Sequence, residues 1–291
     1  MRPTLALGLG EILWDILPES RTLGGAPANF AYHINGLGGY GVPVSCVGDD
    51  VLGREALTQL AQQGLNVHAI TVDPEHPTGT VNARIDYQGV ASYIFPDDVA
   101  WDFLAPNHTA MTLASKAQAL CFGTLAQRSE VSQKAIQEVI LAAPQALKIY
   151  DINLRQRFYT SEIISHSLDM TDVLKINDEE LALVTRLLSL PSGEQEALHT
   201  LMLRHSLKLA VLTRGEKGSL LLSHTSFSDL PGESVPIKDT IGAGDAFTAA
   251  LALAYLNGQS LDEINRYATM VAAYVCGCSG AMPELPDTFK I

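Results

Sequence analysis

A short run of small residues ending in a carboxylate is the part of this chain best suited to chemistry. It reads Asp239-Thr240-Ile241-Gly242-Ala243-Gly244-Asp245, and the apolar segment that follows, to Leu256, is typical of a helix. Gly242 and Gly244 let backbone N–H groups approach a ligand closely, because glycine has no Cβ. The unpaired N–H groups and positive dipole at a helix start favour an anion there. A carboxylate beside such a cradle is suited to taking a proton from a hydroxyl that attacks a phosphoryl group, the role expected for Asp245.

The same run has a simpler interpretation, in which an Asp occupies the first turn of a helix and the glycines make a tight turn before it. A bare GxGD pattern would usually mean no more than that. The longer run, from Asp239 through Phe247, is much less expected by chance than the bare pattern.

Composition narrows the class of protein. Of 291 residues, 47% are hydrophobic and 18% charged, which describes a globular chain with ample core. The net charge of −13 argues against nucleic acid and anionic membrane surfaces as partners. It leaves room for a small phosphorylated ligand, because a site can be locally positive.

Cysteine and histidine usage predicts a reducing, metal-poor setting. The four cysteines lack the density and spacing of a disulfide framework, and the eight histidines show no HxxxH or HExxH grouping, so no transition metal is expected. The apolar run near the N-terminus is too short to span a bilayer and is interrupted by Glu11 and Asp15. We therefore expect a cytoplasmic protein.

Strand-like and helix-like segments alternate along most of the chain. Such alternation predicts an α/β fold with a mostly parallel central sheet and helices on both faces. The expected strands are 5–9, 42–47, 68–72, 119–122, 148–152, 173–176, 209–213 and 219–222. The expected helices are 27–37, 54–63, 130–142, 179–188, 194–204, 245–256 and 261–276.

One region breaks the alternation. Residues 80–86 and 90–95 are short alternating runs joined by Tyr87-Gln88-Gly89, which predicts a β-hairpin. With residues 12–17 the hairpin could form a small separate sheet; the alternative is an antiparallel edge of the main sheet. An exposed, half-apolar sheet also tends to find a partner, so a homodimer through it is plausible.

Polar side chains follow several of the expected strands. Asp151 and Asn153 end one strand, Asn177 the next and Thr213 a third. Ligands of open parallel sheets bind at the carboxyl ends of strands. These residues should therefore share one cleft with Asp245.

The order of motifs along the whole chain resembles the PfkB family of carbohydrate kinases, in the ribokinase-like superfamily. The run that ends at Asp245 resembles the family's C-terminal signature, and Gly24-Gly25-Ala26-Pro27-Ala28-Asn29 resembles the N-terminal one. Between them, Asn177 to Glu180 matches NxxE and Thr213 to Gly218 resembles the TxGxxG loop. Gly280-Ala281 with Pro283 resembles the family's C-terminal loop.

The resemblance implies a single three-layer ribokinase-like domain over residues 1–291, with a β-sheet lid built from segments at about 12–24 and 78–98. It also implies roles for individual residues. Asp15, Gly24, Gly25, Asn29 and Arg155 would contact the sugar, and Asp245 with Gly242, Ala243 and Gly244 would carry the chemistry. Asn177, Glu180, Thr213, Gly215 and Gly218 would border ATP, with Glu180 holding Mg²⁺ through water and Asp239 and Ile241 beside a K⁺ ion.

Each of these residues also has an ordinary structural explanation. Gly24 and Gly25 could form a turn ahead of a helix with Pro27 in its first turn. Asn29 could be a solvated helix residue and Asp15 an exposed turn residue. Glu180 could simply favour a helix dipole.

The substrate is less well defined. Asp151-Ile152-Asn153-Leu154-Arg155 is the DxNxR string of fructokinase-like members, but ketodeoxygluconate kinases share it. We therefore expect an ATP-dependent kinase acting on a primary hydroxyl of a small sugar, fructose first. 2-Keto-3-deoxygluconate, ribose or a nucleoside are alternative acceptors, and a non-catalytic sugar-binding protein of the same fold is a further alternative.

Other nucleotide-binding templates fit poorly. Residues 36–41 match GxGxxG, but a helix is expected before them and a strand after, the reverse of a dinucleotide site. An NAD-dependent oxidoreductase is therefore a minor alternative. There is no GxxxxGK[ST], so P-loop kinases are not a template.

Overall fold

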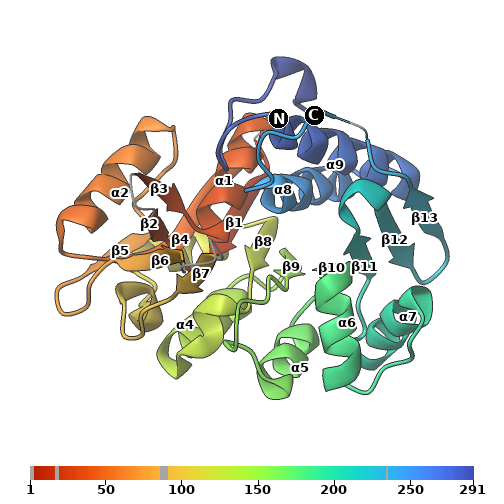
Figure 1. Ribbon diagram of the computed structural model, residues 1–291, viewed down its shortest axis with the longest axis horizontal. Helices are drawn as coiled ribbons and strands as arrows, with labels where there is room; N and C mark the ends of the chain where they lie inside the picture. The colour runs from red at the N-terminus through yellow and green to blue at the C-terminus, as the bar shows by residue number, and fades with distance from the viewer. Residues whose placement is uncertain (1–2, 17–19, 86–90, 234) are drawn as a thin grey trace.

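A nine-stranded sheet forms the centre of the computed structural model, which describes residues 3–16, 20–85, 91–233 and 235–291 (Figure 1). The strand order is β13-β12-β11-β10-β9-β8-β1-β4-β5, parallel from β11 to β5, with β12 and β13 antiparallel at one edge. This confirms the mostly parallel sheet. The strands are β1 (Leu5–Leu9), β4 (Tyr40–Gly48), β5 (Ile70–Asp73), β8 (Ala119–Phe122), β9 (Leu147–Asp151), β10 (Val173–Asn177), β11 (Leu209–Thr213), β12 (Ser219–Ser223) and β13 (Phe227–Leu230).

Helices cover both faces of this sheet, as Figure 1 shows. One apolar layer is built on α1 (Ala26–Gly36), α8 (Ala243–Leu256) and α9 (Leu261–Cys276). The opposite layer is built on α3 (His108–Ala114), α4 (Glu130–Leu141), α5 (Ser161–Asp169), α6 (Asp178–Leu187) and α7 (Glu194–His205). The remaining helix, α2 (Val51–Gln62), packs in a smaller cluster with β4 and β5. No helix in the described ranges is long and apolar enough to cross a membrane.

A second, four-stranded sheet stands apart from the first. Its order is β3 (Arg21–Gly24), β2 (Leu13–Ile16), β6 (Gly79–Ile85) and β7 (Ala91–Ile94). The strands β6 and β7 pair antiparallel as the hairpin prediction requires, while the predicted turn at 87–89 lies outside the described residues. The separate small sheet is thus confirmed, and the alternative of an edge to the main sheet is wrong.

Part of the small sheet is fixed to α2. The indole Nε1 of Trp14 donates to the carbonyl of Leu52 at 3.0 Å. The Arg21 guanidinium lies 5.2 Å from the centre of the Trp14 ring and 2.5 Å from a carboxylate oxygen of Glu55. Strands β2 and β3 are therefore joined to α2 by side-chain contacts as well as by the chain.

Sequence patterns missed some elements. Helices α3 and α5 and strands β3 and β13 were not predicted. Helix α2 begins at Val51, three residues before its predicted start, because the Asp50 side chain accepts the Gly53 N–H and caps the helix there. The order around GxGxxG is as expected, since α1 ends at Gly36 before β4 begins at Tyr40. The dinucleotide interpretation of this motif is therefore excluded.

Close packing of α1 on the sheet depends on two glycines. A Cβ at Gly8 in β1 would run into the carbonyl of Pro27, and one at Gly41 in β4 would run into the carbonyl of Ala31. Both obstacles are backbone atoms of α1, so a larger residue would have to displace the helix.

We predict that Gly8→Ala destabilises the protein by about 1–3 kcal/mol, the usual cost of overpacking a core. Urea unfolding followed by circular dichroism measures this. Gly193→Ala is the control, because there the added methyl meets the Glu196 side chain, which can rotate away. Equal losses in both variants would contradict the packing argument.

Candidate active site

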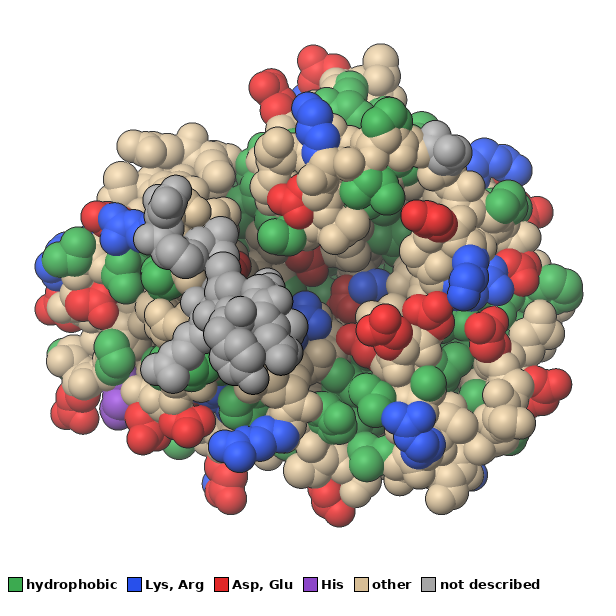
Figure 2. All heavy atoms as spheres, in the orientation of Figure 1, with side chains coloured by type: hydrophobic (Ala, Val, Ile, Leu, Met, Phe, Trp, Pro, Cys, Tyr) green, Lys and Arg blue, Asp and Glu red, His purple; other side chains and the backbone are tan. Residues whose placement is uncertain are grey.

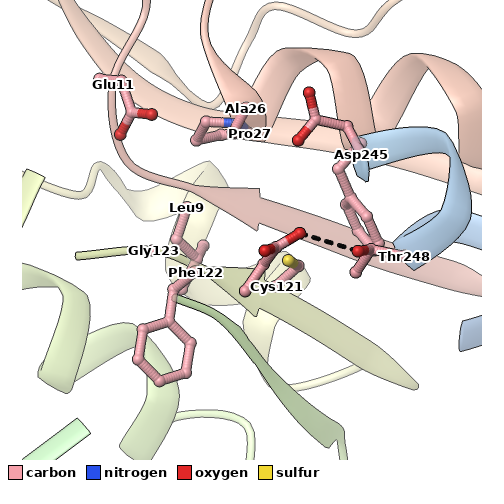
Figure 3. A pocket seen from close by; sticks show the side chains of 11 residues that line it. Leu9, Glu11, Ala26, Pro27, Cys121, Phe122, Gly123, Asp245 and Thr248 are labelled. Carbon is pink, nitrogen blue, oxygen red and sulfur yellow. Dashed lines mark hydrogen bonds between the residues drawn. The ribbon is translucent and has the colours of Figure 1, made fainter. Parts of the chain in front are cut away.

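The amino ends of α1 and α8 meet at the carboxyl ends of β1, β8 and β9. A narrow pocket of about 10 Å³ lies there, with room for roughly one water molecule. In Figure 3, Glu11 and Asp245 lie on opposite sides of Pro27 above the strand ends. Figure 2 shows a hollow near the same part of the molecule, with acidic and basic side chains inside it. The pocket is lined by Leu9, Glu11, Ala26, Pro27, Phe30, Cys121, Phe122, Gly123, Asp151, Asp245 and Thr248.

Asp245 is in the first turn of α8, as predicted. Gly242 is the N-cap residue, with a φ of 78°, and no side chain of the described residues caps this helix. The Ala243 N–H already contacts the Thr240 carbonyl at 3.3 Å. The N–H groups of Gly244 and Asp245 are in the turn where helix geometry leaves amides unpaired, so they are the better anion donors.

The environment of Asp245 favours its protonated form. Desolvation, followed by the charge of Asp151, raises the pKa of Asp245 to about 7, although the Asn29 hydrogen bond and Lys175 act in the opposite direction. A carboxylate whose pKa lies near the working pH suits general base catalysis.

Asn29 links α1 to α8. Its Nδ2 donates to Oδ2 of Asp245 at 2.7 Å, and the residue is 4% exposed. The other end of the amide, Oδ1, is buried and has no hydrogen-bond partner among the described residues. A buried acceptor without a partner is costly, which indicates a donor supplied by a ligand or by water.

A buried ion pair lies beneath the first turn of α8. Nζ of Lys175, in β10, is 3.0 Å from Oδ1 of Asp151, in β9. The Thr248 hydroxyl donates to Oδ2 of Asp151 at 2.8 Å and lies 3.0 Å from the Gly244 carbonyl (Figure 3). Burial disfavours the charge on Lys175, but Asp151 and Glu180 outweigh it, so the pKa of Lys175 is raised.

Glu180 and Asn177 form a reciprocal cap on α6. The Asn177 side chain accepts the Glu180 N–H at 2.8 Å, and Oε2 of Glu180 accepts the Asn177 N–H at 2.9 Å. Oε1 of Glu180 accepts the Leu154 N–H, also at 2.9 Å. Both oxygens of Glu180 therefore already hold backbone amides, which fits contact with a metal through water better than direct ligation.

The residues expected to hold the sugar lie around the start of α1. The Asp15 carboxylate lies 2.9 Å from where a Cβ of Gly24 would be, and Gly25 is the N-cap residue of α1 with a φ of 125°. Burial raises the pKa of Asp15, opposed by the charge of Arg155. Arg155 also lowers the pKa of Glu11, but burial outweighs this effect and raises that pKa to about 7.

The predicted nucleotide loop follows β11. Thr213 is the register partner of Asn177 in β10, so the two side chains share the carboxyl edge of the sheet. Gly215 and Gly218 have φ of 54° and 91°, conformations that favour glycine. The carbonyl of Gly218 accepts the Arg214 N–H at 2.8 Å, which closes the loop.

Two segments expected near a monovalent cation lie together. Oδ1 of Asp239 accepts the Ile241 N–H at 3.0 Å, and Oδ2 accepts the Gly280 N–H at 3.1 Å. The Cys276 carbonyl accepts the Lys238 N–H at 2.9 Å. No group of three or more His, Cys, Asp or Glu side chains suited to a metal occurs in the described part of the chain. A cation here would rely on carbonyl oxygens.

Three residues of the site were missed from sequence. Glu11 lines the pocket, and Lys175 and Thr248 complete the ion-pair network beside it. Lys175 carried a usable signal, because a lysine in the middle of an apolar strand is rarely buried without a partner. Glu11 carried a similar signal, because it interrupts the apolar run near the N-terminus, whereas Thr248 carried none.

The family of the chain follows from comparison with known proteins. A family model described as pfkB family carbohydrate kinase matches residues 19–288. The fructokinase of Salmonella typhimurium is 32% identical over 297 residues, 96% of this chain and 95% of that protein. The chain therefore belongs to the PfkB family of carbohydrate kinases, and it is a sugar kinase.

Solved structures agree on the fold. The fructokinase of Xylella fastidiosa with bound ATP matches with a TM-score of 0.84 at 22% identity, covering 97% of this chain and 95% of that one. A double mutant of the Vibrio cholerae fructokinase, bound to fructose, ADP and a potassium ion, matches with a TM-score of 0.81 at 24% identity, covering 98% and 95%. The ribokinase-like fold is thereby established.

The raised pKa of Asp245 has a consequence for stability. Because the value moves from 3.8 to about 7, the folded protein keeps a proton that the unfolded chain releases. The free energy of unfolding therefore falls as pH rises between these values, and the loss is complete above about pH 7. Asp245→Asn should remove this loss.

We predict that Asp245→Asn has a higher melting temperature than the wild type at pH 8 and that the gap narrows at pH 5. The corresponding difference in the free energy of unfolding is below about 4 kcal/mol, because solvent reaches the half-buried carboxylate and weakens the effect. Asp262→Asn, an exposed first-turn residue of α9, is the control. A wild type that is the more stable protein at pH 8 would refute the argument.

Proposed function

We propose that this sugar kinase transfers the γ-phosphoryl group of ATP to a primary hydroxyl of a small, uncharged sugar, with fructose the first candidate. The observation that carries the proposal is the 2.7 Å hydrogen bond between Asn29 and Asp245. It joins the helix expected to hold the sugar to the helix turn expected to hold the phosphoryl group. A hydroxyl bound at Asn29 would therefore lie beside the base that must take its proton.

The acceptor side is suited to hydroxyl groups. Oδ1 of Asn29 needs a donor, and the Asp15 carboxylate offers acceptors beside Gly24. At Gly24 a side chain would enter the space that Asp15 needs. A polyol with adjacent hydroxyls satisfies both residues at once.

The charge around this pocket favours a neutral acceptor over an acidic one. Glu11 lines it, Asp15 lies beside Gly24, and the charge of Arg155 acts on both carboxyl groups. Arg128, a second cation near Glu11, is held by the Asp102 carboxylate at 2.8 and 2.7 Å. A carboxylate or phosphate on the sugar would lie near the carboxyl groups of Glu11 and Asp15, which counts against 2-keto-3-deoxygluconate and sugar phosphates.

The nucleotide side rests on the relatives. The fructokinase of Xylella fastidiosa binds ATP, and that of Vibrio cholerae binds fructose, ADP and potassium. By analogy, ATP would lie along Asn177, Thr213, Gly215 and Gly218. Glu180 would hold Mg²⁺ through water, and the loops at Asp239 and Gly280 would hold K⁺. Mg²⁺, when bound, neutralises charge on the phosphates.

Residues of this chain then divide the reaction between them. Asp245 accepts the proton of the attacking hydroxyl while Asn29 holds the carboxylate in place. The N–H groups of Gly244 and Asp245, with Ala243 if its contact to Thr240 is given up, stabilise the charge on the transferring phosphoryl group. The small sheet, acting as a lid over the sugar, would exclude water and so limit ATP hydrolysis.

A second candidate is a sugar-binding protein that has lost catalysis. It is the weaker one because Asp245, Gly242 and Gly244 are all present at the start of α8, and loss of one of them would be expected in a protein that has lost catalysis. Ribose and nucleosides are neutral as well, so the charge argument does not exclude them as acceptors.

We predict that ADP release with Mg²⁺-ATP and potassium is strongest with fructose among fructose, ribose, 2-keto-3-deoxygluconate, tagatose 6-phosphate and adenosine. Asp245→Asn should retain sugar binding in a thermal-shift assay and lose about 10²–10⁴-fold in kcat, the usual contribution of a positioned general base. Asp262→Asn should turn over normally. Near-normal kcat in Asp245→Asn would overturn the mechanism, and no turnover with any sugar would favour the binding protein.

We predict separately that Glu180→Gln raises the Mg²⁺ concentration needed for half-maximal rate by about tenfold or more, the usual scale for a group that orients a metal's ligands. Glu179→Gln, the exposed neighbour in α6, is the matched control and should titrate like the wild type. If Glu180→Gln responds to Mg²⁺ as the wild type does, the role assigned to Glu180 is wrong.

A further inference from the structure

Lys175 is a buried cation with no assigned part in the reaction. It is 8% exposed and lies within a strand whose other residues are mostly apolar, Val173–Asn177. Moving a charged lysine out of water is expensive unless the charge is used and paired. Its pairing with Asp151 at 3.0 Å explains how the buried charge is stabilised. The pair also lies next to the first turn of α8, where phosphoryl transfer is proposed.

The geometry ties this pair to α8 by two routes. A Cβ placed on Gly244 would lie 3.0 Å from Nζ of Lys175, so the ammonium group touches the turn that precedes Asp245. On the other side, Thr248 connects Asp151 to the Gly244 carbonyl through one hydroxyl group, 2.8 Å from the first and 3.0 Å from the second. The ion pair therefore supports the first turn of α8 from below.

The charges around Asp245 come from every element that packs there. Asp151 of β9 and Glu11 of the segment after β1 are acidic and oppose ionisation of Asp245, while Lys175 of β10 favours it. Asn29 of α1 donates a hydrogen bond, and the Cys121 thiol of β8 has its own pKa raised and stays neutral. In this set Lys175 is the cation.

We propose that Lys175 is a positioning residue of the kinase: with Asp151 and Thr248 it fixes the first turn of α8, and its charge makes ionisation of Asp245 less costly beside two other carboxylates. The inference rests on the role proposed for Asp245. It adds that Asp245 can act as a base near neutral pH because the charge of the buried Lys175 offsets the charge of Asp151.

The charge effect is measured on Asp245 itself. In protein labelled with carbon-13 at the aspartate carboxyl groups, the Asp245 resonance is the one missing from Asp245→Asn, and its shift against pH gives its midpoint. Lys175→Met should move that midpoint upward by about one pH unit or more, and Asp151→Asn should move it downward. Lys148→Met, which removes a lysine from the opposite end of β9, should leave it in place.

The positioning effect is measured by kinetics. Thr248→Val removes the bridging hydroxyl without changing charge, so kcat should fall about tenfold or more while the Asp245 midpoint stays put; Thr248→Ser should recover most of the rate. If Lys175→Met does not fold, Asp151→Asn and Thr248→Val still carry the test. Midpoints that do not respond to charge in the folded variants, or a Thr248→Val enzyme with the wild-type kcat, would overturn the inference.

The two proposals fail differently. If the wild type phosphorylates no sugar, the proposed function is wrong, yet the carboxyl titration still reports whether Lys175 and Asp151 set the ionisation of Asp245. If the wild type is active and the midpoints do not move, the proposed function stands and the role of Lys175 falls.

Discussion

The site depends on a single close contact between the amino ends of two helices. Asn29 of α1 and Asp245 of α8 meet at 2.7 Å, although 216 residues separate them. Both helices cover the same face of the sheet and pack in one apolar layer, so their meeting point is fixed by that packing. Gly8 and Gly41 let α1 lie against β1 and β4, and the position of Asn29 follows from this close approach.

Both the whole chain and the pocket are acidic, although the proposed nucleotide is itself an anion. The protein carries −13 overall, and the pocket itself collects Glu11, Asp151 and Asp245. In the proposed reaction an anionic nucleotide would be held next to them. The amino end of α8 at Gly242 and the buried Lys175, paired with Asp151, are the local sources of positive potential there, so net charge alone does not describe the site.

Much of this arrangement was accessible from sequence. Polar residues at strand ends predicted a common cleft with Asp245, and Asp151 lines one pocket with it, because the carboxyl ends of parallel strands meet at one edge. Asn153, Asn177 and Thr213 belonged to the same prediction but are not among the residues that line this pocket. The glycines around Asp245 predicted the uncapped helix start. Two short alternating runs at residues 80–95 predicted a hairpin, and the sequence left open whether it joined a small separate sheet or the edge of the main sheet; the structure shows the separate sheet.

What was missed has physical reasons. The strand β13 is four residues long at a sheet edge with Phe227 exposed, so it lacks the apolar run that marks a buried strand. In α5, a polar stretch that begins with the Thr160 cap hides two buried anchors, Ile164 and Leu168. The pairing of Lys175 with Asp151 is a contact between neighbouring strands, and no local pattern reports which strand lies next to which.

The attachment of the small sheet to α2 bears on how fast a ligand can enter or leave. The buried Trp14 and the partly exposed pair of Arg21 and Glu55 bind strands β2 and β3 to that helix. Swinging the sheet outward must either drag α2 with it or break this clasp. If the small sheet acts as the proposed lid, these contacts would add to the barrier for opening it, and ligand exchange would then depend on residues outside the pocket around Asp245.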